Sequence, residues 1–146
     1  MKTLWNEANR RELGERIARL TPDRTPLWGR MNARQMVAHL VDAMRMATGD
    51  LPIRMRKTPF RYPLVKQLVV YVVPIPKGMP TVKELQREPG TWGAEMANLR
   101  EMLEKFAARD RNGPWPTHPA FGPLGAHAWG VLTLRHCDHH LRQFGV

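Results

Sequence analysis

The sequence predicts an all-α protein, specifically a four-helix bundle with a basic, proline-rich insertion between the second and third helices. Three observations support this prediction. Four long segments carry apolar residues at helical spacing, one long crossover follows the second of them, and no internal repeat or low-complexity tract competes with the pattern. At 146 residues the chain is near the commonest domain size, so we expect residues 1–146 to form a single domain.

The first two predicted helices span residues 4–20 and 33–48. Apolar residues recur through the first segment in a helical rhythm, and a Thr-Pro-Asp sequence then ends it. Asn32 is the predicted N-cap of the second helix, because Gln35 follows three residues later in a capping-box arrangement. Gly49 then fits the C-terminal stop that follows Thr48.

The predicted insertion, residues 51–83, has a different composition from the rest of the chain. It contains seven Lys or Arg, six Pro and no Asp or Glu. Residues 64–73 form an apolar run that could be a short buried helix or a strand. The β-branched content favours a strand and the Leu64/Leu68/Val72 spacing favours a helix; we predict the helix. Residues 74–80 are expected to be an extended loop. The basic residues suit either a solvated loop or an anion-binding surface.

The third and fourth bundle helices are predicted at residues 91–108 and about 124–144. The former keeps apolar residues at helical spacing, with charged residues that include Glu95 on its polar side. In the latter, Trp129, His136, His140 and Gln143 fall within a narrow stripe, and Arg135, Asp138 and Arg142 collect opposite. The histidine stripe is therefore expected to face the interior.

The net charge of +10 favours anionic partners, but no helix-turn-helix or finger motif is present, so nucleic acid is not the expected partner. Cys137 is the only cysteine, which excludes an intrachain disulfide. The longest apolar stretch, residues 68–75, is far shorter than the roughly 20 residues that a membrane span requires. We expect a cytoplasmic protein with no membrane partner.

The histidines are the strongest chemical signal. In a helix His136 and His140 lie one turn apart, close enough to share one metal ion, and His39 lies on the predicted buried side of the second helix. Three imidazoles would bind one side of a divalent ion and leave other positions open. A single inward histidine is more often a core residue, and an i, i+4 pair alone divides evenly between the two interpretations.

Other residues are assigned supporting roles. Asp42, one turn beyond His39, could orient a ligand histidine or could equally be an exposed carboxylate. His139 is an alternative ligand with a poorer direction, and Cys137 is expected to be a small buried thiol. His118 and His127 are expected in loops or at the surface. Trp28 and Trp129 are expected to be core residues that could also wall a pocket above the metal, and Gln35 and Gln143 complete the predicted set around it.

The segment His136-x-x-x-His140-Leu141-Arg142-Gln143, together with His39 on a helix that follows Trp28-Gly29-Arg30-Met31, resembles the DinB-like superfamily of metal-binding four-helix bundles. It is similar in particular to a small bacterial branch that ends in His-His-Leu-Arg-Gln-Phe-Gly. The resemblance implies that His39, His136 and His140 bind a divalent metal such as Ni or Zn, with Mn or Fe also compatible. A homodimer would suit the same family.

The resemblance also implies a reaction class. Members with known activity use the metal to activate a thiol, so we predict an enzyme of transferase or hydrolase type that activates a thiol or water on a small substrate. No catalytic residue is assigned. A non-catalytic metal-binding or interaction module is the alternative, followed by a basic nucleic-acid-associated protein.

Overall fold

The structure is a computed structural model that describes residues 1–78 and 81–146. It has five α-helices and two short 3-10 helices, and the described residues form no strand beyond one isolated bridge between His118 and Gly122. The elements are α1 (Glu7–Ile17), α2 (Ala33–Thr48), η1 (Pro59–Arg61), α3 (Pro63–Tyr71), η2 (Lys83–Leu85), α4 (Trp92–Ala108) and α5 (Ala126–Gln143). The predicted all-α class is confirmed. No helix in the described part of the chain is long and apolar enough to cross a membrane.

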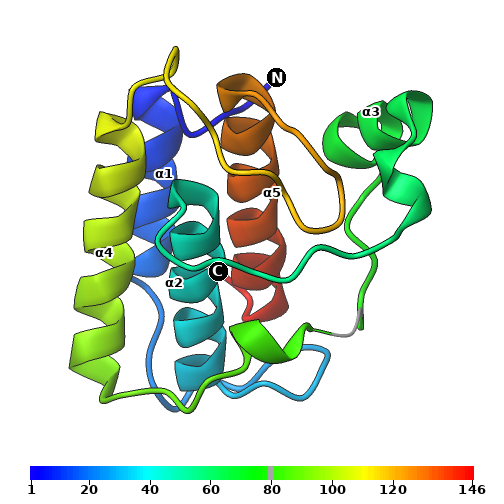
Figure 1. Ribbon diagram of the computed structural model, residues 1–146. Coiled ribbons are helices and arrows are strands. Elements are labelled where there is room, and N and C mark those ends of the chain that lie inside the picture. The colour runs from blue at the N-terminus through cyan, green and yellow to red at the C-terminus, as the bar shows by residue number, and fades with distance from the viewer. Residues whose placement is uncertain (79–80) are drawn as a thin grey trace.

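Helix α2 lies at the centre of the structure. It packs against α4 on one side and α5 on the other, and α1 packs against α5 (Figure 1). Most of its residues are buried, from Ala33 to Thr48. The short helix α3 stands apart from α1, α2 and α4 and contacts α5 and η1. A residue on the α5 side of α2 is therefore placed to meet side chains from α5.

The helix ends follow local sequence signals. Asn32 and Gln35 form the predicted capping box, and Gly49 ends α2 with a φ of 86°, a conformation that glycine adopts without strain. The predicted ends of the first helix were wrong, because α1 begins at Glu7 with Asn6 as its cap. Leu4 precedes the helix yet is fully buried, so its apolar side chain belongs to the core but not to the helix.

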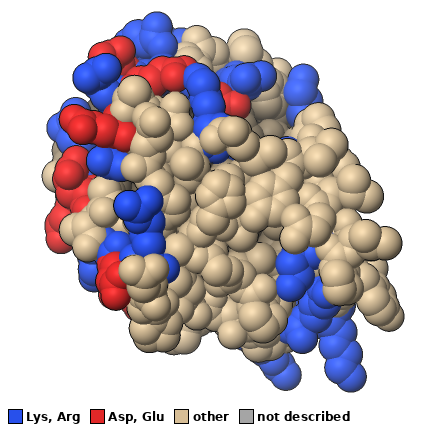
Figure 2. All heavy atoms as spheres, turned by 90° about the horizontal axis from the view of Figure 1, so that it is seen from above, with Lys and Arg blue, Asp and Glu red and all other residues tan. Residues whose placement is uncertain are grey.

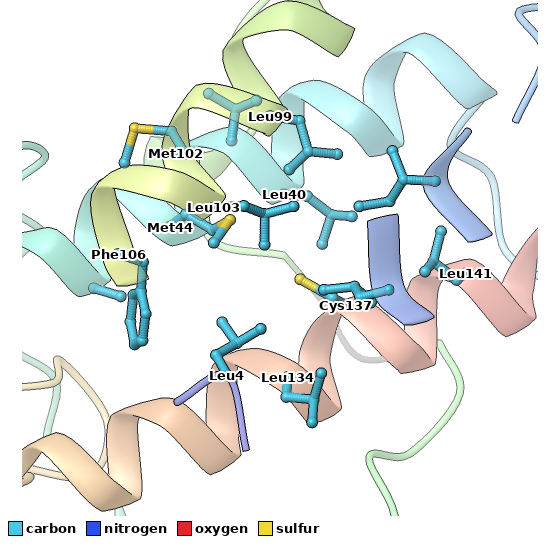
Figure 3. Close-up of a cluster of buried hydrophobic side chains, with 14 of the residues drawn as sticks. Leu4, Leu40, Met44, Leu99, Met102, Leu103, Phe106, Leu134, Cys137 and Leu141 are labelled. Atoms are coloured by element: carbon cyan, nitrogen blue, oxygen red, sulfur yellow. The ribbon is translucent and has the colours of Figure 1, made fainter. Parts of the chain in front are cut away.

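The core is built from apolar side chains of α1, α2, α4 and α5, together with Leu4, and part of it is shown in Figure 3. Leu40 and Met44 meet Leu99 and Leu103, and Cys137 lies among the labelled side chains of this cluster. Cys137 is a buried free thiol, as expected, and burial raises its pKa to about 12. A thiol in this environment stays protonated at neutral pH and packs as a small apolar group.

Residues 64–73 are mostly helical, which confirms the prediction of a helix over a strand. The expected burial was wrong, because only Val70 of α3 is buried and Leu64 and Leu68 are exposed. Arg135 of α5 holds the C-terminal end of α3, since its guanidinium donates hydrogen bonds to the backbone carbonyls of Val69, Val70 and Val73. Helix ends leave such carbonyls without partners inside the helix. The predicted extended loop at 74–80 is described only to Gly78, because Met79 and Pro80 lie outside the described residues.

Candidate metal centre

Three imidazole rings converge between α2 and α5. Nε2 of His136 lies 3.1 Å from Nε2 of His39 and 3.1 Å from Nε2 of His140. Ligand atoms of the three residues all lie within 4.8 Å of one another, the only His, Cys, Asp or Glu group of this kind in residues 1–78 and 81–146. The structure therefore brings together the three histidines that the sequence assigns to a metal.

The outer nitrogens of two rings are fixed by hydrogen-bond acceptors. His39 Nδ1 lies 3.3 Å from the carbonyl oxygen of Leu85, and His140 Nδ1 lies 2.8 Å from Oε1 of Gln143. Only an Nδ1–H can form a hydrogen bond with these oxygens, so in the neutral rings Nε2 carries the lone pair. Two lone pairs thus point toward the same place, next to Nε2 of His136.

The orientation of the Gln143 amide is itself determined. Its Nε2 donates to the backbone carbonyl of Trp28 at 2.7 Å, and a carbonyl can only accept, so Oε1 must face His140. Gly29 makes this approach possible: a Cβ at that position would lie 2.5 Å from Gln143 Nε2, and its φ of 84° also disfavours a side chain. The segment before α2 therefore sets the tautomer of a histidine on α5.

Burial keeps the rings neutral. His39 and His140 are 5% and 7% exposed, and burial lowers the pKa of both, that of His140 to about 3. Burial, with further contributions from His140 and His39, holds the pKa of His136 well below its usual range. The neutral imidazole is the form that binds a metal, so these side chains need not lose a proton to act as ligands.

The spacing fits a shared metal ion. A zinc–nitrogen bond is about 2.0–2.1 Å long, so two nitrogens on one ion lie roughly 2.9–3.4 Å apart at octahedral or tetrahedral angles. The two measured separations of 3.1 Å fall within this range. The hydrogen bonds at the two Nδ1 atoms are of the kind that orient metal-binding histidines in proteins.

A cavity of about 1160 Å³ adjoins the three histidines. Its wall combines apolar and aromatic side chains with a few polar ones, which is typical of sites for small molecules. The apolar part includes Trp28, Met31, Met46, Phe60, Val69, Phe121, Trp129 and Leu132; the polar part includes Gln35, Arg56, Gln86, Arg87 and Glu88. The indole N–H of Trp28 is buried and makes no hydrogen bond within the described structure. A ligand in this space would find apolar contacts together with a few polar side chains.

Comparison with known proteins identifies the family. Residues 8–145 match the family described as "Protein of unknown function (DUF1569)". The chain belongs to the DUF1569 family. No curated protein and no solved structure matches it.

In this DUF1569 chain a buried ion-pair network supports the histidine on α2. Arg87 donates to both carboxylate oxygens of Glu95 at 2.6 and 2.7 Å, and its Nε lies 3.0 Å from Asp42. Glu95 and Asp42 are 2% and 1% exposed. Arg87 follows η2, whose last residue, Leu85, supplies the carbonyl that faces His39. The network therefore fixes the chain segment on which the tautomer of His39 depends.

Asp42 and Glu95 differ from their sequence-based assignments. Asp42 is buried and contacts Arg87 and Arg45, so among the described contacts it acts on the site through an arginine and not through a histidine. The prediction that Glu95 lies on a polar side was wrong. Its position four residues before Leu99 places it on the apolar stripe of α4, a signal that was available in the sequence.

The remaining predicted residues surround the triad without joining it. His139 is half-buried, outside the group of three, with its ring edge toward Trp28 at a centroid distance of 5.8 Å. Trp129 is buried in the cavity wall. Gln35 also lines the cavity, and its side-chain oxygen accepts a hydrogen bond from the backbone N–H of Asn32. His127 is exposed, as expected.

His118 lies in a loop, as predicted, but its ring is not at the surface. It packs against Trp129 and Phe121, and Nδ1 lies within hydrogen-bond distance of the backbone amides of Ala120 and Phe121. Burial lowers the pKa of His118 to about 3. Loop prolines concealed this position, because they suggest an exposed connection.

Replacing Arg87 by Gln tests how much the ion-pair network contributes to the free energy of unfolding. The substitution leaves two buried carboxylates without their shared partner, and we expect unfolding free energy to fall by about 3 kcal/mol, the lower end for such pairs because Arg87 is partly exposed. Arg100→Gln on the exposed side of α4 removes the same charge and should change stability by less than about 0.5 kcal/mol. Urea denaturation of both variants measures the difference.

The same variant has a defined pH dependence. Arg87 lowers the pKa of Glu95 from its ordinary value of 4.5, so the stabilisation exists above that value and is lost as pH falls toward the folded-state pKa. The stability gap between the wild type and Arg87→Gln should therefore be widest near neutral pH and narrow below pH 4.5. A gap that stays constant down to acid pH would contradict this role for Glu95.

Proposed function

We propose that this protein is a DinB-like four-helix bundle that binds a divalent metal through Nε2 of His39, His136 and His140. The proposal depends on one observation: Nε2 of His136 lies 3.1 Å from Nε2 of His39 and 3.1 Å from Nε2 of His140, and the ligand atoms of all three residues lie within 4.8 Å of one another. In the proposed bundle α1, α2, α4 and α5 are the four helices, and residues 51–83 are the insertion. Ni and Zn fit the all-nitrogen donor set best, and Mn or Fe remain compatible.

The surrounding residues suit an open site better than a closed one. Three imidazoles leave at least one coordination position for a further ligand, and a cavity large enough for a small molecule begins beside them. A bound divalent cation would lower the pKa of a thiol or water that coordinates it. Gln143 and the Leu85 carbonyl would hold His140 and His39 in the ligand tautomer, while apolar side chains exclude bulk water.

We propose a metal-dependent reaction of transferase or hydrolase type, in which the metal would activate a thiol or a water molecule for reaction with a small substrate. The cavity supports this choice over a purely structural metal, since a structural ion is usually enclosed by four protein ligands. A non-catalytic metal-binding module is the second candidate, because three buried ligands on two packed helices would also join α2 to α5. Binding of a thiol separates the two.

The metal assignment predicts the composition of the purified protein. Protein prepared without a nickel column should carry about one divalent metal per chain by elemental analysis, and His136→Ala should lose most of it because the central ligand is gone. His127→Ala removes an exposed histidine from the same helix and should leave the metal content unchanged. Stoichiometric metal in His136→Ala would refute the assignment.

Gln143→Leu tests the tautomer argument. The substitution keeps side-chain size but removes the acceptor at His140 Nδ1, and metal affinity should fall about 10–100-fold by competitive chelator titration. Gln67→Leu, at an exposed position on α3, should bind metal as the wild type does. Equal affinities in the two variants would show that Gln143 does not orient the ligand.

An open coordination position predicts thiol binding. Cobalt(II) substituted into the site should change its visible absorption when a small thiol is added, because a new ligand alters the geometry around the ion. His136→Ala mixed with cobalt provides the background. A cobalt spectrum that does not respond to thiols or small anions would favour the non-catalytic metal module over the enzyme.

A further inference from the structure

Helix α3 has one face turned inward and the other exposed to solvent. Val70 is fully buried, and Val69 lines the cavity. Leu64, Leu68 and Val72, spaced four residues apart, are 81%, 52% and 66% exposed. The Arg135 hydrogen bonds at the end of α3 hold the helix in this orientation.

Exposed apolar residues are concentrated in this part of the molecule. Eight large hydrophobic side chains are exposed in the described part of the chain, and six of them lie between residues 55 and 73. They are Met55, Tyr62, Leu64, Leu68, Val72 and Val73. Scattered apolar residues on a surface need no explanation, but a cluster on one short helix and the residues next to it indicates an interaction surface. We call Tyr62, Leu64, Leu68 and Val72 the α3 face.

Cationic residues flank the α3 face in the sequence. Arg54 and Lys57 are exposed and have no carboxylate within ion-pair distance among the described residues, and the segment 51–83 contains no Asp or Glu. Arg61 and Lys66 also have no such carboxylate, but their side chains donate to the backbone carbonyls of Pro119 and Pro123. The one described ion pair of this segment joins Arg56 to Glu84 at 3.8 Å. On the side where α3 lies in Figure 1, Figure 2 shows Lys and Arg side chains beside uncharged surface, whereas mixed charges cover the opposite side.

We propose that the α3 face docks on an anionic lipid surface, with the apolar side chains in the headgroup region and the flanking Lys and Arg on lipid phosphates. An exposed apolar helix face flanked by cations is the arrangement by which peripheral proteins bind membrane interfaces. Long basic side chains can reach phosphates while their apolar stems lie beside the helix. None of the four residues of the α3 face lines the histidine cavity, although Val69 on the other side of the helix does.

Charge argues against the other occupants of this face. In a symmetric dimer formed through α3, the cations of one copy would face the same cations of the second copy, which is unfavourable without intervening acids. A nucleic acid would pair with the cations but not with exposed Leu and Val, and single-stranded binding uses aromatic stacking, for which the α3 face offers only Tyr62.

The sequence-based expectation of no membrane partner depended on the lack of a run long enough to span a bilayer. An interfacial helix needs no such run. What the sequence did not reveal is that Leu64, Leu68 and Val72 lie outside the core. The docking proposal therefore replaces that expectation for membrane surfaces, and it concerns a peripheral contact only.

The test is co-sedimentation of the full chain with lipid vesicles. Vesicles of phosphatidylcholine with roughly a third phosphatidylglycerol should bind the wild type, and pure phosphatidylcholine vesicles should bind it about tenfold more weakly or not at all. Leu64→Gln/Leu68→Gln should weaken anionic-vesicle binding about tenfold or more, while Leu27→Gln, at an exposed leucine elsewhere, should not. Thermal melts confirm that each variant is folded.

A second pair of variants keeps the test decisive if the leucine variant does not fold. Arg54→Gln/Lys57→Gln should weaken binding about tenfold. Arg11→Gln/Arg19→Gln, at exposed positions on α1 and just after it, removes the same charge but should change binding less than threefold. Equal losses in the two pairs would mean attraction to net charge alone and would overturn the proposal. The proposal would also be overturned if the wild type did not bind anionic vesicles. The same conclusion would follow if the wild type were a dimer that binds no vesicles and Leu64→Gln/Leu68→Gln converted it to a monomer.

Discussion

The buried imidazoles of His39 and His140 both direct an Nε2 lone pair toward the ring of His136. This requirement constrains how α2 and α5 are placed relative to each other. The Leu85 carbonyl and Gln143 Oε1 occupy the Nδ1–H groups of His39 and His140, so neither Nε2 can donate. A single N–H on His136 could serve both lone pairs only as a shared donor. The proposed cation would satisfy all three nitrogens at once, without adding a proton that burial disfavours.

This arrangement requires groups that lie far apart in the chain. The tautomer of His140 depends on Gln143, whose amide is held by the Trp28 carbonyl before α2. The tautomer of His39 depends on the segment after the insertion, and Arg87 ties that segment to α2 and α4 through two buried carboxylates. Such ion pairs contribute little net stability over an apolar core, but removing one partner is costly, so they specify position more than they stabilise.

Helical geometry accounts for how much of the site could be predicted from sequence. The spacing of His136 and His140 and the inward direction of His39 follow from 3.6 residues per turn. The extents of α2 and α4 were predicted to within a residue, because local capping signals and the range of apolar spacing mark them in the sequence. The Leu85 carbonyl has no signature, because every residue carries that group. The start of the first helix was predicted too early because Leu4 is apolar. An apolar side chain indicates burial, and Leu4 is buried without being part of the helix.

The run at residues 64–73 shows why composition alone is a weak guide to position. Its apolar residues are of the kind expected in a buried core, yet α3 buries one side and leaves the other exposed. The charge is distributed just as unevenly: the 33 residues of segment 51–83 hold 7 of the 23 Lys and Arg and none of the 13 Asp and Glu. The other 113 residues therefore carry 16 cations against 13 acids, a nearly balanced surface. A basic character needed only for solubility would be spread over the molecule, whereas cations gathered around an exposed apolar helix indicate one anionic and partly apolar surface as the partner.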